Sequence, residues 1–217
     1  MSLAWQATLF GADAPTVDPS LSGVERIDLD ATAWVDHLPG WLRGPDEVMA
    51  TLVRTAPWTA SSRPMYDRIV EVPRLTAWFS WDGGYATGVP PIIGEMRAAL
   101  SKRYRVRFTS CGCNLYRDGH DSVAWHGDRI SKEVVDPRVA IVSVGEPRAL
   151  LLRPLAPPER ASEQATRRSS VRFELGHGDL LVMGGTSQRT WQHSVPKVAT
   201  AGPRMSITFR HGMVPVA

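Results

Sequence analysis

The sequence predicts a mainly β protein, of α+β character, in which a barrel or sandwich core follows an N-terminal extension of mixed helices and strands. From Arg105 onward, short apolar runs recur at regular intervals between turn residues, which is typical of such cores. Residues 204–210 alternate apolar and polar side chains without interruption, as a strand with two different faces does. The clearest helical patterns lie before Arg105. We therefore expect one domain over residues 1–217, with the β core at about 105–213 and the extension at about 1–104.

The first part of the extension is expected to be mostly irregular. Residues 11–23 are rich in Gly, Ala, Asp, Pro and Ser, and a short strand is expected near 24–29. Asp30 or Thr32 is suited to cap a short helix after that strand, because both side chains can accept a backbone N–H.

Two longer helices are predicted further along the extension. Pro45-Asp46-Glu47 is suited to begin the first, which runs to about residue 55 and ends at Pro57. The second covers about 90–100 and again has prolines at its start. Between them, residues 63–88 mix Trp, Tyr, Gly and Pro without a clear period, which favours strands or a flap with long loops.

The β core is predicted to consist of short strands joined by turns. The candidate strands are 105–117, 122–127, 138–144, 149–153, 170–175, 179–184, 190–194 and 204–211. Gly145-Glu-Pro-Arg148 makes a tight connection between two of them. Residues 154–170 have the composition of a solvated loop.

The last strand places two arginines on one polar face. At about 3.3 Å per residue, the Cα atoms of Arg204 and Arg210 are roughly 20 Å apart, so their side chains can bracket a short dicarboxylate. The planar guanidinium group meets carboxylates through two parallel hydrogen bonds. Ser206 and Thr208 lie between the arginines and either contact the same diacid or fill space. The alternative is an ordinary exposed strand face.

Asn114 and Tyr116 repeat this pattern upstream, with Leu115 on the opposite face of the strand. Both side chains can donate hydrogen bonds to the same diacid, although polar residues also decorate strands without a function.

A candidate metal site comes from His126, Asp128 and His193. Residues two apart on a strand point to the same side, and a folded barrel can bring His193 from a distant strand. Two imidazoles and one carboxylate occupy one face of an octahedral iron and leave positions for a chelating cosubstrate and dioxygen. His-x-Asp alone also occurs by chance. We interpret His177 as part of a turn and His120 as facing solvent.

These residues, taken in order, resemble the AlkB family of iron(II)- and 2-oxoglutarate-dependent dioxygenases over roughly residues 72–211. The matching string is Asn114-Leu-Tyr116-Arg-Asp-Gly119, Trp125-His126-Gly-Asp128, Gly184-Gly185, His193 and Arg204-x5-Arg210. The resemblance implies a double-stranded β-helix (jelly roll) and oxidative removal of alkyl groups from nucleobases. It implies iron ligands, which are also the catalytic residues, at His126, Asp128 and His193. It implies 2-oxoglutarate contacts at Asn114, Tyr116, Arg204, Ser206 and Arg210.

The chain departs from the family pattern just after the second ligand. The family usually carries an acidic residue there that helps to recognise the damaged base, whereas this chain has Arg129-Ile-Ser131, and its next acid is Glu133. The identity of the base therefore stays open, and Arg129 is itself a candidate substrate contact.

Several aromatic residues are candidates for contacts with a base. Trp78, Trp81 and Tyr85 occupy the part of the pattern that forms a recognition lid in the family, and a stacked aromatic contributes roughly 1–3 kcal/mol per base. Trp191 precedes His193 by two residues and is expected to share its strand face. For each of these residues, packing in the core is the alternative.

Composition limits the partners and the compartment. The net charge is +3, and the basic residues comprise three lysines and twenty-two arginines, a bias that suits phosphate recognition but also follows from codon usage. Cys111 and Cys113 form no disulfide framework, and no long apolar run suggests a membrane span. We expect a cytoplasmic monomer that acts on nucleic acid and not at a membrane.

The leading hypothesis is oxidative dealkylation of bases such as 1-methyladenine or 3-methylcytosine in DNA. Iron(II) would serve as cofactor, with 2-oxoglutarate and dioxygen as cosubstrates, and 2-oxoglutarate would leave as succinate. The first alternative keeps this chemistry but applies it to RNA, a small metabolite or a peptide. The second is a barrel that binds a ligand without catalysis.

Overall fold

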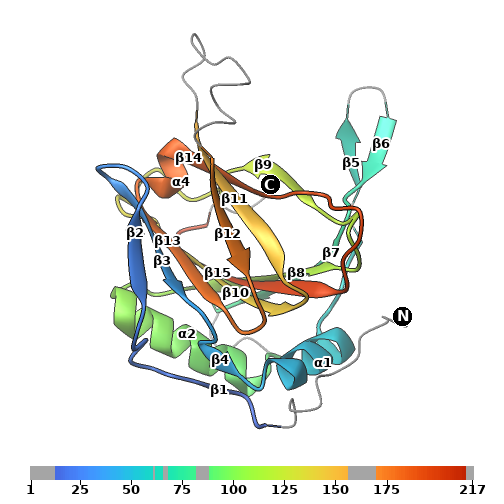
Figure 1. Cartoon of the computed structure of the whole chain (residues 1–217), viewed down its shortest axis with the longest axis horizontal. Helices are drawn as coiled ribbons and strands as arrows, with labels where there is room; N and C mark the ends of the chain where they lie inside the picture. The colour runs from blue at the N-terminus through green and yellow to red at the C-terminus, as the bar shows by residue number, and fades with distance from the viewer. Residues whose placement is uncertain (1–12, 61, 66–67, 82–87, 156–169, 214–217) are drawn as a thin grey trace.

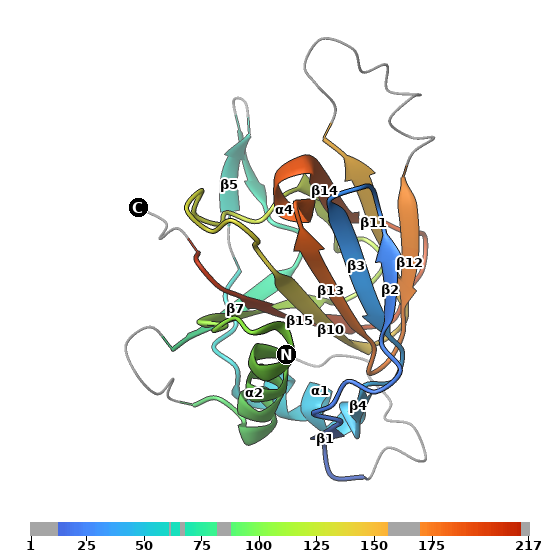
Figure 2. The same ribbon diagram turned by 90° about the vertical axis from the view of Figure 1, so that its left-hand side faces the viewer.

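Two antiparallel sheets face each other and form the centre of the molecule (Figures 1 and 2). The computed structural model describes residues 13–60, 62–65, 68–81, 88–155 and 170–213. The seven-stranded sheet has the order β2 (Glu25–Asp28), β3 (Ala33–Leu38), β13 (Leu180–Gly185), β10 (Val139–Gly145), β15 (Arg204–Arg210), β8 (Ser110–Tyr116) and β7 (Leu75–Ser80). The four-stranded sheet has the order β12 (Val171–Leu175), β11 (Arg148–Pro154), β14 (Trp191–Val195) and β9 (Val123–His126). The mainly β prediction is confirmed.

Among the described elements, two helices cover the outer side of the seven-stranded sheet, and a third, short helix lies between β13 of that sheet and β14 of the four-stranded sheet (Figure 2). The helices are α1 (Pro45–Thr55), α2 (Pro91–Tyr104) and α4 (Ser187–Thr190). Two small ribbons complete the described elements: β1 (Thr16–Val17) pairs with β4 (Leu42–Arg43), and β5 (Ser62–Met65) pairs with β6 (Arg68–Glu71).

The alternation of β15 explains how this sheet separates two cores. Met205, Ile207 and Phe209 pack with the buried faces of α1 and α2, while the polar residues of β15 point into the space between the sheets. A second core lies between the sheets and includes Ile141 and Leu150, one from each sheet. Because a strand alternates its side chains, one strand can hold the helices on one side and line a pocket on the other.

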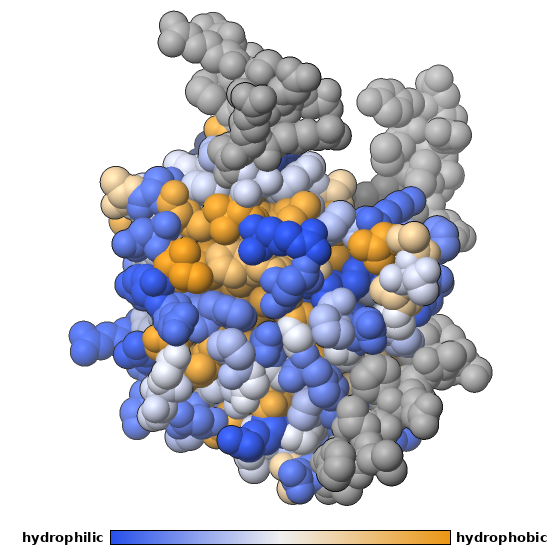
Figure 3. Space-filling view, viewed as in Figure 1, coloured by the Kyte–Doolittle hydropathy of each residue, from blue (hydrophilic) through white to orange (hydrophobic). Residues whose placement is uncertain are grey.

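Apolar residues gather on one face of the molecule. Figure 3 shows them gathered in the upper half of the face seen in Figure 1, over strands of both sheets, with hydrophilic residues around and below them. Leu29 and Val171 are partly buried and pack against the core between the sheets. In the described part of the chain, no helix is long and apolar enough to cross a membrane.

The ends of α1 and α2 confirm the sequence signals from which these two helices were predicted. Each helix has a proline in its first turn, where the missing N–H costs nothing. Asp46 and Glu47 lie in the first turn of α1 and Arg54 in its last, which suits the helix dipole. Helix α2 extends beyond the predicted end, to Tyr104, because its buried face continues through Leu100 and Tyr104.

One predicted helix is absent, and one predicted strand begins later than expected. No short helix follows Asp30: its carboxylate accepts the backbone N–H groups of Thr32 and Ala33, and this turn leads into β3 instead. The strand predicted from residue 105 begins only at Ser110, because Arg105 ends α2 in the left-handed conformation (φ 54°) and residues 106–109 form an irregular connection. Arg97 of α2 donates to the carbonyl oxygen of Phe108 in the connection between α2 and β8.

His177 connects α1 to the seven-stranded sheet. This structural role agrees with the interpretation of His177 as part of a turn. Its Nδ1 accepts the backbone N–H of Gly145 at 2.8 Å, and its Nε2 lies 3.2 Å from Oδ1 of Asp46. Burial lowers the pKa of His177 below 6.5 and outweighs the attraction of Asp46 for the charged form.

Acid is therefore expected to weaken the fold through His177. The folded state holds the imidazole neutral more strongly than the unfolded chain does, so its contribution is complete above about pH 6.5 and is lost as the pH falls toward the lower folded pKa. We expect the free energy of unfolding to depend less on pH in His177→Gln than in the wild type between pH 7.5 and 5.5. Urea unfolding at several pH values measures this, and equal pH dependence in both proteins would contradict it.

Candidate metal and dicarboxylate site

A polar pocket lies between the two sheets. It is lined by residues of both sheets and of the segments next to them: Arg74, Asn114, Tyr116, Val123, His126, Ile141, Leu150, His193, Val195, Arg204, Ser206, Thr208 and Arg210. The strand register explains why the polar ones meet: on β8 and β15, Asn114 lies opposite Ser206 and Tyr116 opposite Arg204. The sequence predicted which residues share a face, and the pairing of β8 with β15 brings them to one place.

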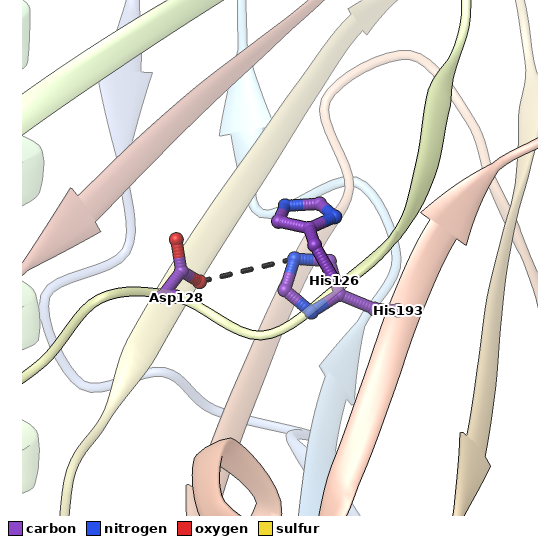
Figure 4. A group of neighbouring side chains, drawn as sticks. All are labelled: His126, Asp128 and His193. Carbon is purple, nitrogen blue, oxygen red and sulfur yellow. Dashed lines mark ion pairs between the residues drawn. The ribbon is translucent and has the colours of Figure 1, made fainter. Parts of the chain in front are cut away.

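The three predicted metal ligands lie together, and two of them, His126 and His193, line this pocket. His126 ends β9, Asp128 follows two residues later, and His193 lies on β14 opposite His126. One ligand atom from each residue lies within 4.8 Å of the others, and in the described part of the chain no other group of three such residues does so. Figure 4 shows the three side chains directed toward one another, with Oδ2 of Asp128 3.8 Å from Nε2 of His193.

Asp128 is held as an anion in a buried place. Its side chain is 6% exposed, and Oδ1 accepts a hydrogen bond from Nε of Arg210 at 2.6 Å. Burial alone would raise the pKa of Asp128, but Arg210 and the two imidazoles outweigh it, so this pKa lies below its usual value. Oδ2 accepts no hydrogen bond from any described residue. A buried carboxylate oxygen without a donor is suited to bind a cation.

The imidazoles are suited to the same cation. Burial lowers the pKa of His193 to about 4, so its ring is neutral and its nitrogen lone pair is available near neutral pH. Nδ1 of His126 lies 2.9 Å from the carbonyl oxygen of Ala124, and a proton there leaves Nε2 as the ligating nitrogen. Two neutral imidazoles and one carboxylate form the donor set of non-heme iron(II) sites with open positions.

Arg204 supplies a buried positive charge to the same pocket. The side chain is 1% exposed, its Nε donates to Oγ of Ser143 at 3.2 Å, and its guanidinium carbon lies 5.1 Å from the ring centre of Tyr116. Nη1 has no hydrogen-bond partner among the described residues. A buried cation with a free donor is costly unless an anion joins it, so this part of the pocket fits a carboxylate.

The two arginines that were expected to bracket a dicarboxylate have different surroundings. Both line the pocket, but Arg210 is bonded to Asp128, and Arg204 keeps an unused donor. Asn114 donates to Oγ of Ser206 at 3.3 Å and accepts from Nε of Arg74 at 2.9 Å. No sequence pattern indicated Arg74, because it precedes β7 outside any periodic segment.

The candidate base contacts differ in how exposed they are. Trp78 is 47% exposed on β7, and its ring centre lies 5.9 Å from the guanidinium carbon of Arg210. Gly112 leaves room for this ring, since an added Cβ would lie 3.0 Å from Trp78 and from Arg210. Arg129 is exposed directly after Asp128. Tyr85 lies outside the described residues.

Trp81 and Trp191 are buried instead, as in the core packing that was the alternative for each of them. Trp81 is three residues from Trp78, so it points to the opposite face of the sheet and packs beside Arg97 of α2. Trp191 lies in the core between the sheets but does not line the pocket, and its Nε1 donates to Oδ2 of Asp30 at 2.6 Å. The period of two residues in β7 was a signal that could have separated the two tryptophans.

Comparison with known proteins shows which family and which relatives the chain is similar to. The model of the 2OG-Fe(II) oxygenase superfamily matches residues 45–210. The alpha-ketoglutarate-dependent dioxygenase alkB homolog 3 of Mus musculus is 33% identical over 201 residues, which are 87% of this chain and 70% of that protein. The DNA oxidative demethylase ALKBH2 of Arabidopsis thaliana is 32% identical over 181 residues, 71% of this chain and 58% of that protein.

A solved structure confirms the fold. The structure of OsALKBH1 superimposes with a TM-score of 0.55 at 15% sequence identity, covering 86% of this chain and 100% of that chain. At this identity the likeness concerns the fold alone, and it supports the predicted jelly roll.

Proposed function

This chain belongs to the 2OG-Fe(II) oxygenase superfamily and, within it, to the AlkB family, and on that premise we propose that it removes alkyl groups from nucleobases in DNA. It is a dioxygenase that uses iron(II), 2-oxoglutarate and dioxygen. The observation that carries the proposal is a pocket lined by two imidazoles and a buried arginine with a free donor, with an anionic carboxylate, one of whose oxygens is free, beside the imidazoles.

The residues of the pocket fit the required groups. We assign iron(II) to His126, Asp128 and His193, and the 2-oxoglutarate carboxylate remote from the metal to Arg204. When bound, iron(II) supplies oxidation of the alkyl carbon by dioxygen, coupled to conversion of 2-oxoglutarate to succinate and carbon dioxide. Asn114, Tyr116, Ser206 and Thr208 are proposed to orient the cosubstrate through hydrogen bonds from the polar wall that they form.

The protein contributes orientation and exclusion of water. Arg210 fixes one oxygen of Asp128 and leaves the other directed toward His193. Burial keeps His193 neutral and therefore able to ligate. Ile141 and Leu150 add apolar surface to the pocket, which limits water around the reacting groups.

Trp78 supports a base as the substrate. A half-exposed indole at the edge strand of the sheet, close to Arg210, offers a flat surface for a planar group that enters the pocket. The target base must leave the stack or arrive in a single strand, and stacking on an aromatic ring offsets part of that cost. Arg129 and the absence of an acid at residues 129–131 leave open whether the preferred base is cationic, as 1-methyladenine and 3-methylcytosine are, or neutral.

The test is coupled turnover on defined oligonucleotides. The protein is reconstituted with iron(II) without oxygen and then exposed to oxygen and 2-oxoglutarate with single-stranded DNA carrying 1-methyladenine, 3-methylcytosine or the neutral 3-methylthymine. We expect succinate and loss of the methyl mass in equal amounts. Succinate without any change in the oligonucleotides would reject DNA repair, and the same assay on methylated RNA, peptides and metabolites would then identify the substrate.

A Trp78→Ala variant examines the base contact in the same assay. Loss of one stacking ring is expected to lower kcat/KM for the oligonucleotide by about tenfold, while succinate formation without oligonucleotide is unchanged. Ile27→Ala is the matched control, because Ile27 is an exposed apolar residue on β2, at the opposite edge of the same sheet.

A further inference from the structure

The backbone of Asp128 lies beyond the end of a strand and takes its support from α4. Strand β9 ends at His126, so the sheet ladder does not hold Gly127 and Asp128. The N–H of Asp128 instead donates to Oε1 of Gln188 at 3.2 Å. Gln188 is 7% exposed, and its amide nitrogen lies 3.5 Å from the sulfur of Met183. One buried amide therefore connects the loop of the carboxylate to the core of the sheet.

The next residue of α4 holds the segment that follows Asp128. Arg189 donates to the carbonyl oxygens of Ile130 at 3.0 Å, Ser131 at 2.6 Å and Val134 at 3.1 Å. A guanidinium fork can serve three carbonyl groups at once because its donors lie in one plane at fixed angles. This contact fixes the turn of residues 130–134, and with it the backbone next to Arg129.

Helix α4 is in turn fixed to the rest of the fold. The N–H of Thr186 donates to the carbonyl oxygen of Thr32 at 3.0 Å, and Trp191 donates to Asp30. On the other side of the segment, the N–H of Ser131 donates to the carbonyl oxygen of Gly212 at 2.7 Å. The segment after Asp128 is therefore held between α4 and the end of β15.

We propose that Gln188 and Arg189 are positioning residues that set the direction of the Asp128 carboxylate toward the imidazoles, an inference that rests on the proposed iron site. Arg210 holds one oxygen of this carboxylate, and Gln188 holds the backbone from which it extends. Both restraints are needed because a side chain fixed only at its tip can still rotate with its backbone. Sequence patterns could not reveal this role, since Gln188 and Arg189 are 55 to 60 residues from the backbone groups that they contact.

The experiment measures metal affinity separately from stability. Cobalt(II) is titrated without oxygen and without 2-oxoglutarate into the wild type, Gln188→Met and Arg189→Lys, and its visible absorption reports the coordination. Gln188→Met keeps the volume but removes the acceptor, and Arg189→Lys keeps the charge but removes the fork. We expect the metal affinity to fall about tenfold in each, the range typical for residues that orient metal ligands.

Matched controls separate positioning from general loss of structure. Gln192→Met removes a glutamine that accepts from Arg153, and Arg172→Lys alters an exposed arginine of β12. Both controls are expected to bind cobalt(II) as the wild type does. Wild-type affinity in Gln188→Met and Arg189→Lys, even with lowered melting temperatures, would reduce α4 to a structural support and overturn the inference. No cobalt(II) binding by the wild type would instead reject the proposed iron site itself.

Discussion

Replacing Asp128 by alanine or asparagine is expected to abolish succinate formation. Asp128 is the carboxylate of the metal cluster, and its free Oδ2 is the oxygen placed toward His193. An asparagine has nearly the same shape but no negative charge, so it cannot balance the cation or replace the anionic oxygen. His126→Ala is expected to have the same effect. The readout is succinate formed from 2-oxoglutarate by protein reconstituted with iron(II), and near-normal turnover in either variant would remove the metal assignment.

The two Asp128 variants are expected to differ in stability. Asparagine can still accept the hydrogen bond of Arg210, whereas alanine leaves the guanidinium group, in a side chain only 11% exposed, without its partner. Breaking a buried ion pair by removing one member typically costs roughly 3–5 kcal/mol. We therefore expect a lower melting temperature for Asp128→Ala than for Asp128→Asn in the metal-free proteins. His120→Ala, which alters an exposed histidine, is the control that should retain turnover.

The composition of the pocket was largely predictable because its residues follow local rules. The alternation of β15 placed Arg204, Ser206, Thr208 and Arg210 on one face, and the structure brings all four to the pocket. The spacing of His126 and Asp128 likewise implied a common direction. The alternation of a strand and the spacing of two neighbouring ligands involve only a few residues of the chain, so both can be recognised in the sequence alone.

The contacts made by the same residues were not predictable. The bond between Arg210 and Asp128 joins positions eighty-two residues apart and depends on how β15 lies relative to the end of β9. Asp30 had the features of a helix cap, but its carboxylate serves a turn and Trp191 instead. Tertiary packing chooses Arg210 and Trp191 as partners, whereas the turn of Asp30 is a local alternative to the helix cap that the same residue type allows.

Arg204→Met is expected to impair use of 2-oxoglutarate while the metal site stays intact. The guanidinium group is buried, lies apart from the Asp128 contact of Arg210, and keeps Nη1 free of hydrogen bonds among the described residues. A charge-assisted hydrogen bond contributes roughly 1.5–3 kcal/mol, so the affinity for 2-oxoglutarate should fall by about 10- to 100-fold. Arg210→Met should weaken both metal and cosubstrate binding, because it also releases Asp128.

A second buried arginine gives the control for this prediction. Arg148 is 3% exposed and donates to the carbonyl oxygens of Asp118, Asp121 and Pro196, but it does not line the pocket. Arg148→Met should therefore lower the melting temperature and leave the affinity for 2-oxoglutarate unchanged. Anaerobic titration of the cobalt(II)-loaded variants with 2-oxoglutarate measures that affinity. If Arg204→Met binds the cosubstrate as the wild type does, the diacid is held elsewhere, and the free donor of Arg204 needs another explanation.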